Sequence, residues 1–111
     1  MHVEPCEVAR RKEAYLFPNV RTYYAEPLVL VEGHAVRVWD AGGREYLDLF
    51  GGILTVSVGH GHPRVVEAVC EQVRRIMHTS TCYLNEPMLE LARRLAEVTP
   101  GRLQKTFFAN S

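Results

Sequence analysis

Lysine is nearly absent from this chain of 111 residues, although basic side chains are otherwise common. Lys12 and Lys105 are the only lysines among 13 basic residues, and 13 acidic residues balance them to a net charge of zero at pH 7. A balanced chain lacks the one-sided positive field with which proteins bind nucleic acids and anionic membrane surfaces. The sequence therefore predicts neither nucleic acid nor a membrane as a partner.

Cysteines are few, and long hydrophobic runs are missing. Cys6, Cys70 and Cys82 are an odd number at unrelated spacings, which excludes a disulfide framework. The longest apolar candidate, residues 51–58, is far shorter than the ~20 residues of a membrane span. The chain does not open with a basic stretch followed by an apolar one, so a secretory signal is not predicted. We therefore expect a soluble protein of the cytoplasm.

The composition that is present is that of a globular protein, with 47% hydrophobic and 23% charged residues in a chain long enough for one modest domain. Three helices are predicted. The first covers residues 6–16 and ends before Pro18, because the residue before a proline is pushed out of the helical region. The second runs from Pro63 to about residue 77, where apolar side chains recur at helical spacing. The third follows Asn85, a residue typical of a helix N-cap.

Strands are predicted on both sides of the helical region. Alternating apolar residues indicate a hairpin of residues 28–32 and 35–39 around the two-residue turn Gly33-His34, and a third strand over residues 45–50. Such a three-stranded antiparallel meander needs a second layer before it is stable. A further buried strand is predicted over residues 105–110. These elements together place the chain in the α/β class.

Two groups of metal-ligating residue types lie on either side of the second predicted helix. His60-Gly61-His62 precedes it, and His78 and Cys82 follow it at a spacing of four residues. That helix would span ~24 Å at ~1.5 Å per residue, and the chain has no CxxC or HExxH spacing, so we expect no metal site. A Cys–His nucleophile pair is not predicted either, because nothing nearby in the sequence orients the histidine.

Glycines cluster around one apolar residue, Ile53. Gly51, Gly52, Gly59 and Gly61 form neither a GxGxxG nor a Walker A pattern, so a nucleotide phosphate loop is not predicted. Clustered glycines allow a backbone to approach a ligand closely, and Ile53 would then be a presented apolar side chain. A tight structural turn explains the same residues without a ligand. The sequence leaves both explanations open.

A succession of motifs resembles one known family. Residues 38–48, VWDAGGREYLD, resemble the opening strands of the class III aminotransferases, the omega-aminotransferase family of fold type I. Gly51-Gly52-Ile53, the run GHGHP with the helix after it, residues 79–83 and the final TFFANS continue the similarity in the family's order. The resemblance covers residues 15–111 and looks closest to the branch of 4-aminobutyrate and alanine–glyoxylate aminotransferases.

This resemblance implies a pyridoxal 5′-phosphate enzyme, usually a homodimer, that moves an amino group from an amino acid or omega-amine to a 2-oxo acid. It implies that Ile53 faces the substrate and that residues 79–83 border the active site near the dimer interface, so Tyr83 is a second substrate-binding candidate. It also implies that Ser111 binds the cofactor, as the start of the turn that cradles its phosphate. A helix N-terminus after a strand suits that role, because its free N–H groups and its dipole attract an anion.

The resemblance also indicates what this chain does not supply. The chemistry needs a lysine that bonds the cofactor and a carboxylate at the pyridine nitrogen. Neither Lys12 nor Lys105 lies where the family's lysine motif falls, and the only aspartates, Asp40 and Asp48, belong to the meander. We therefore predict an N-terminal fragment that is inactive by itself, with its catalytic lysine beyond the chain end.

The predicted division of this fragment places residues 1–100 in the small domain and residues 101–111 at the start of the large cofactor-binding domain. Two other functions stay open. One is a decarboxylase or aminomutase with the same fold and cofactor. The other is a small non-catalytic α/β binding module, which would fold cooperatively alone. A fragment is expected to be poorly soluble instead, because the strand over residues 105–110 lacks its sheet neighbours.

Overall fold

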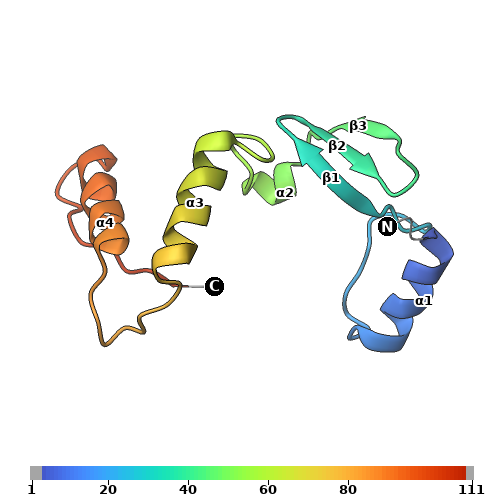
Figure 1. The fold of residues 1–111 in the computed structure, drawn as a ribbon, viewed down its shortest axis with the longest axis horizontal. Helices are drawn as coiled ribbons and strands as arrows, with labels where there is room; N and C mark the ends of the chain where they lie inside the picture. Colours follow the sequence, from blue (N-terminus) through green and yellow to red (C-terminus); the bar gives the residue numbers. More distant parts are fainter. Residues whose placement is uncertain (1–3, 110–111) are drawn as a thin grey trace. The chain divides into compact units, whose positions relative to one another are not determined.

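The computed structural model describes residues 4–109, which form four helices and three strands (Figure 1). The chain divides into two compact units, one that extends to Val69 and one that starts at Cys70. The first unit contains α1, the sheet and α2, and the second contains α4. No helix among the described residues has the length and apolar character that a membrane span requires.

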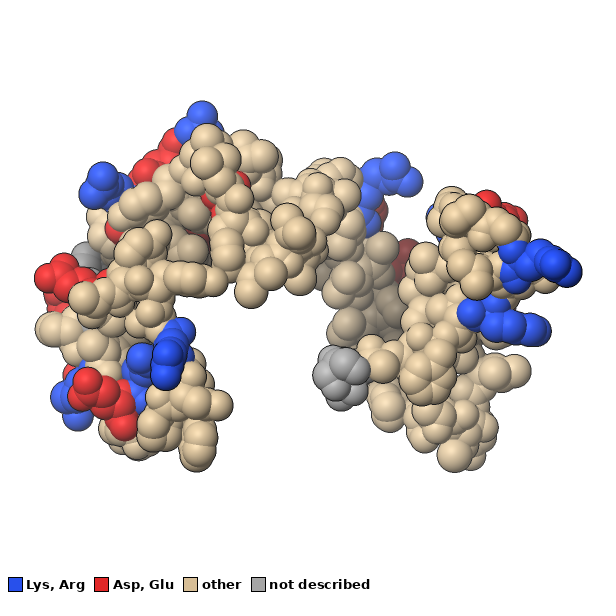
Figure 2. Space-filling view, turned by 180° about the vertical axis from the view of Figure 1, so that it is seen from behind, with Lys and Arg blue, Asp and Glu red and all other residues tan. Residues whose placement is uncertain are grey.

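Helix α1 covers Pro5–Tyr15, within one residue of the prediction at each end. Proline suits the first helical turn, because its missing N–H has no partner there in any case. Glu7 accepts hydrogen bonds of 2.8 Å from the guanidinium groups of Arg10 and Arg11, one helical turn further along. Acidic and basic side chains accordingly lie side by side over this helix, at the lower left of Figure 2.

The meander is confirmed as a three-stranded antiparallel sheet in the order β1–β2–β3 (Figure 1). Its strands are β1, Leu30–His34, β2, Arg37–Asp40, and β3, Glu45–Leu47. His34 pairs with Arg37, so the hairpin turn consists of Ala35 and Val36. The predicted turn at Gly33-His34 is therefore wrong by two residues.

The reason for this shift is the packing of Gly33. A Cβ atom on Gly33 would lie 2.8 Å from Cγ of His60, so the glycine gives room for an imidazole ring rather than a turn. Ala35 takes the turn position instead, with a φ of 50°. A glycine in a strand is typical of such a close approach.

The turn between β2 and β3 is held by the carboxylate of Asp40. Its Oδ1 accepts hydrogen bonds of 2.9 Å from the backbone N–H groups of Gly42 and Arg44, and its Oδ2 accepts one of 2.7 Å from the Tyr46 hydroxyl. The Tyr46 hydrogen bond is the largest cause of the lowered pKa of Asp40, and the same bond raises the pKa of Tyr46. Among the described hydrophobic side chains Val38, in the middle of β2, is the one that is buried.

The two long helices predicted from apolar spacing are confirmed as α3, Pro63–Arg75, and α4, Glu86–Val98. Asn85 caps α4 as predicted, because its Oδ1 accepts a hydrogen bond of 3.0 Å from the Met88 N–H. The apolar stripes of both helices are partly exposed; those side chains include Val66, Val69, Val73, Leu91 and Leu95.

The predicted strand over residues 105–110 is not found among the described residues. Residues 103–109 belong to no helix or strand, and the Phe107 side chain is 92% exposed. The physical reason is that a strand requires a hydrogen-bonded neighbour, and no described strand pairs with this segment. Asn110 lies outside the described residues.

Candidate functional site

The most unusual backbone of the chain is the short turn α2, Gly51–Leu54. Its four residues have φ values of 54°, 58°, 59° and 64°, so the turn is left-handed throughout. Glycine adopts this conformation freely, but an L-residue in it costs about 1–2 kcal/mol. Ile53 is the extreme case because its side chain is branched at Cβ. Gly51 and Gly52 therefore adopt the left-handed backbone without strain, whereas Ile53 and Leu54 are strained in it.

The strained side chains point away from the described protein. The Ile53 side chain is 70% exposed and that of Leu54 is 84% exposed, so their own packing does not offset the strain. Hydrogen bonds on the C-terminal side support the turn instead. The Thr55 N–H donates to the carbonyl of Gly51 at 2.9 Å, and the Thr55 hydroxyl donates to that of Gly52 at 2.7 Å.

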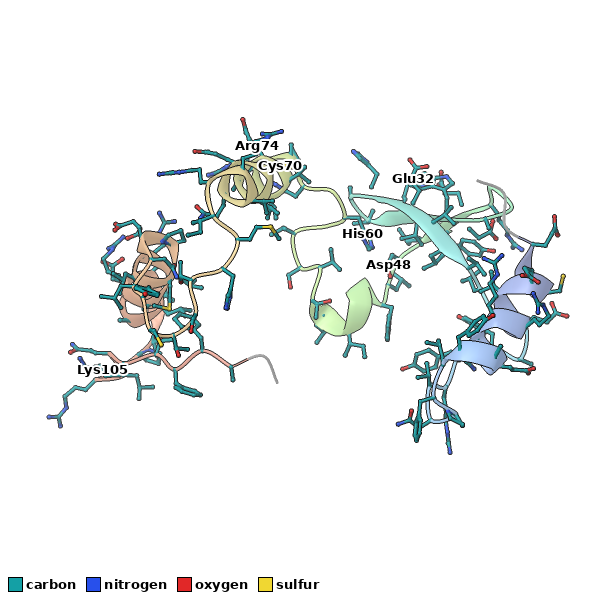
Figure 3. The ribbon with its side chains drawn as sticks, turned by 60° about the horizontal axis from the view of Figure 1, so that its bottom comes forward. Glu32, Asp48, His60, Cys70, Arg74 and Lys105 are labelled. Atoms are coloured by element: carbon teal, nitrogen blue, oxygen red, sulfur yellow. The ribbon has the colours of Figure 1, made fainter. Side chains whose placement is uncertain are left out.

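Asp48 supports the turn on its N-terminal side. Its Oδ1 accepts hydrogen bonds of 2.9 Å from the N–H groups of Phe50 and Gly51. Its Oδ2 lies 2.6 Å from Nε2 of His60, a pair labelled in Figure 3. The hydrogen bond to His60, followed by those of Gly51 and Phe50, lowers the pKa of Asp48. The carboxylate is therefore ionised at neutral pH and can only accept, so Nε2 of His60 carries the proton and donates.

His60 is in turn fixed to the hairpin. Its N–H donates to the Ala35 carbonyl at 2.8 Å, and its own carbonyl accepts from the Ala35 N–H at 2.9 Å. Its ring lies against Gly33, as described above. Gly59 is required beside it, because its φ is 88° and a Cβ atom there would lie 3.0 Å from the Ala35 backbone. The glycine cluster thus has a structural reason in the approach of two chain segments.

Asp48 and His60 form a pair that the sequence alone does not bring together. The sequence places Asp48 in the meander and in the family-like run 38–48, and His60 in the run GHGHP and in a rejected group of metal-ligating residue types. One signal was available, because an aspartate that precedes a glycine pair by three residues is typical of a turn capped by the carboxylate. The partner of the carboxylate, twelve residues further along, has no local signal. Among the described residues, no group of three or more His, Cys, Asp or Glu is placed to hold a metal ion.

The other predicted site residues lie apart from this turn in the sequence. Tyr83, between α3 and α4, is 72% exposed, and Ser111 lies outside the described residues. The same connection contains Ser80 at a φ of 60°. Its neighbour Thr79 accepts a hydrogen bond of 3.1 Å from the side chain of Asn85. Strained residues tend to cluster at functional sites, and both segments that the resemblance singles out contain one.

Ile53 belongs to the first unit and Tyr83 to the second. The substrate-binding role of each residue stays a prediction. The second unit has a pocket of about 120 Å³ next to Thr79, and the first has one of about 250 Å³ at the end of α1, beside Lys12. Small-molecule sites usually measure about 300–1,000 Å³, so neither of these pockets matches a substrate site by itself.

The fold is that of the pyridoxal-phosphate aminotransferases of fold type I. The structure is similar to an (S)-enantioselective omega-transaminase from Thermomicrobium roseum, with a TM-score of 0.76 and 39% identity, over 95% of this chain and 25% of that one. It is also similar to the ornithine aminotransferase of Toxoplasma gondii, with a TM-score of 0.76 and 32% identity, over 85% of this chain and 21% of that one.

The family follows from the sequence comparison, in which the model of the class-III aminotransferases matches residues 20–111. The chain belongs to this family. It is 53% identical to the acetylornithine aminotransferase of Methanopyrus kandleri over 93 residues, which are 84% of this chain and 24% of that protein. It is 45% identical to the human mitochondrial alanine–glyoxylate aminotransferase 2 over 97 residues, 87% of this chain and 19% of that protein. The chain therefore spans about a fifth to a quarter of the length of these relatives.

Proposed function

We propose that this chain is the N-terminal part of an aminotransferase that transfers an amino group from an amino acid or omega-amine to a 2-oxo acid. The observation that carries the proposal is the match of residues 20–111 to the class-III family. The names of the relatives give the substrate classes to test first, namely N-acetylornithine, and alanine with glyoxylate.

The cofactor in this proposal is pyridoxal 5′-phosphate, which occupies the active site of the related Toxoplasma gondii protein in part. The described residues of this chain do not fit it by themselves. Asp40 and Asp48 are both committed to turns, and Lys105 is exposed in a segment without helix or strand. We therefore derive no reaction step from these residues. Ser111 is proposed to contact the phosphate of the cofactor.

The part that this chain plays in the site is to bind the substrate. Ile53 presents an apolar side chain from a turn whose backbone is fixed on both sides, and it is proposed to contact the apolar portion of the amino donor. Tyr83 is proposed as a second substrate-binding residue. In this arrangement residues 1–100 belong to the small domain, and residues 101–111 begin the domain that binds the cofactor.

The full-length protein is proposed to be a homodimer in the cytoplasm, with a small-molecule amino donor and a 2-oxo acid as its partners. The support for this proposal is the family to which the chain belongs. The mass in solution, measured by light scattering on the protein expressed from its complete gene, tests the dimer.

The reaction is tested by the visible spectrum of the same purified protein. Saturation with pyridoxal phosphate is expected to give a yellow protein. Alanine or N-acetylornithine in excess is expected to bleach the colour, and glyoxylate or 2-oxoglutarate to restore it. The amino group must then appear on the acceptor, and the donor must become the matching oxo compound. An unchanged spectrum contradicts the proposal. Release of carbon dioxide indicates a decarboxylase, and isomerisation without an acceptor indicates an aminomutase.

A further inference from the structure

We propose that Asp48 and His60 are positioning residues that hold Ile53 in its strained conformation and thereby set which amino donors the enzyme accepts. This inference rests on the proposed function, because it assumes that Ile53 faces the donor. Neither residue is proposed to touch the substrate or the cofactor.

The turn of residues 51–54 needs support from other residues. Ile53 and Leu54 both have positive φ values, and both side chains are largely exposed. A residue held in a sparsely populated backbone conformation persists only when its surroundings determine it. Without support, the turn would relax to a right-handed or extended backbone, and the side chain of Ile53 would change direction.

Asp48 supplies this support at the N-terminal side of the turn. One carboxylate oxygen accepts from two consecutive N–H groups, those of Phe50 and Gly51, and the other meets Nε2 of His60 at 2.6 Å. The side chains of Asp48 and His60 are only 13% and 27% exposed, so water competes weakly for these contacts. The entry of the chain into the left-handed turn is thus determined by one carboxylate.

His60 anchors Asp48 to the hairpin. His60 is hydrogen-bonded through its backbone to Ala35 in both directions, and its ring is seated on Gly33 of β1. The carboxylate therefore joins the turn to the end of the hairpin through its contact with His60, and both residues are labelled in Figure 3. His60 contacts the sheet, and Asp48 contacts His60. The first residues of the turn donate hydrogen bonds to Asp48.

The consequence for the reaction is one of specificity. A hydrophobic contact that distinguishes one methylene group changes kcat/KM by about 10–200-fold. A freed turn no longer offers Ile53 in one place, so the enzyme discriminates less between donors of different length. The ratio of kcat/KM for two donors measures this directly, because it does not depend on the fraction of the enzyme that is folded or loaded with cofactor.

The experiment uses the holoenzyme expressed from its complete gene and two amino donors that differ by one methylene group. Ile53→Ala is measured first and is expected to reduce the ratio about tenfold. Asp48→Ala and His60→Ala are expected to reduce it in the same direction. His60→Gln is expected to restore most of the ratio, because its amide N–H reaches the carboxylate in place of Nε2. The controls Glu32→Ala and His34→Ala, exposed positions of the same hairpin, are expected to leave the ratio unchanged.

The possible results distinguish the positioning role of Asp48 and His60 from the proposed function. If Ile53→Ala changes the ratio and the variants of Asp48 and His60 do not, the positioning role is wrong while the proposed function stands. If Ile53→Ala leaves the ratio unchanged in an active aminotransferase, Ile53 does not face the donor, and the inference fails with it. If Asp48→Ala does not fold, Asp48→Asn, which keeps one acceptor for the two N–H groups, decides in its place. Equal loss of the ratio in the two control variants also overturns the inference.

Discussion

The two units of the chain hold their polar side chains in different ways. In the first unit, Asp40 and Asp48 accept hydrogen bonds from the backbone of turns, and Asp48 also reaches a histidine twelve residues further along. In the second unit, the ion pairs join residues three or four positions apart on helices, as in the pairs of Glu90 with Arg93 and Arg94 on α4, and α1 of the first unit has pairs of the same kind. The carboxylates that accept hydrogen bonds from turns determine the path of the backbone. The helical ion pairs lie on the surface of helices that apolar spacing already predicts.

This difference predicts which substitutions change the backbone conformation. A side chain that determines a turn fixes several φ and ψ angles at once, and its loss changes the positions of residues that it does not touch. A surface pair on a helix competes with water and has little effect on the backbone.

Gly59→Ala is expected to be the most harmful of the proposed changes, with a loss of about 3 kcal/mol in the free energy of unfolding. The new Cβ atom would lie 3.0 Å from the backbone of Ala35, at a residue whose φ is 88°. Gly43→Ala is the matched control, because Gly43 has a φ of 82° with nothing within 4 Å of its Cβ position. Its expected cost is about 1 kcal/mol. Equal costs in urea unfolding of the full-length protein would show that the contact with Ala35 is unimportant.

Asn85→Ala is expected to lower the free energy of unfolding by about 1 kcal/mol, the usual cost of a lost N-cap. The change removes the acceptor for the Met88 N–H and the donor to Thr79. Asn85→Asp keeps the acceptor and should restore most of the stability. A shift of the urea midpoint that is as large for Asn85→Asp as for Asn85→Ala would assign the effect to Thr79 instead of the cap.

The pair of Asp48 and His60 is expected to give an acid-sensitive contribution to stability. The pKa of Asp48 is lowered in the folded protein, mainly by His60, whereas an unfolded aspartate titrates near about 3.9. A lowered folded pKa stabilises the protein above the unfolded value, and this contribution is lost as the pH falls through the folded pKa. Asp48→Asn should therefore lower the unfolding temperature at neutral pH, and its curve should converge with that of the parent below about pH 3.9. Parallel curves would contradict the prediction.

Arg93→Ala is expected to have the smallest effect of the four. Arg93 and Arg94 lower the pKa of Glu90 to about 2, but all three side chains are on the surface of α4. The stabilisation by ionised Glu90 is present above its usual pKa of 4.5 and is lost as the pH falls toward about 2. Salt of roughly 1 M screens such pairs. The difference between Arg93→Ala and the parent in circular-dichroism melts should therefore vanish in high salt, and a difference that persists there would require another explanation.

Local rules predict most of the fold from the sequence. Helical spacing predicts α3, the polar side chain of Asn85 predicts the start of α4, and alternation predicts the three strands. The errors occur where the structure depends on distant residues. Gly33 was interpreted as a turn residue because no local pattern shows that His60 packs on it. The segment after Lys105 reads as a strand by composition, but pairing is a property of two segments.

The candidate site divides in the same way. The glycine cluster is compatible with a close approach to a ligand or with a tight turn around Ile53, and the structure contains a turn. The left-handed conformation of Ile53 and Leu54 themselves is not predictable from local rules, because branched and bulky residues disfavour it. The structure adds the side chains that hold it, and Asp48 and His60 become interpretable as a pair only when the hairpin brings their segments together.

The dependence of the Gly51–Leu54 turn on the hairpin also sets an order for folding. Helices α3 and α4 contain only local hydrogen bonds and can form early, whereas the turn needs the Ala35–His60 pairing, across 25 residues of chain, before Asp48 has its second partner. We therefore expect the N–H groups of Phe50 and Gly51 to be fully protected from exchange with solvent only after this pairing has formed. Hydrogen exchange measured at these two N–H groups therefore tests whether the meander has assembled.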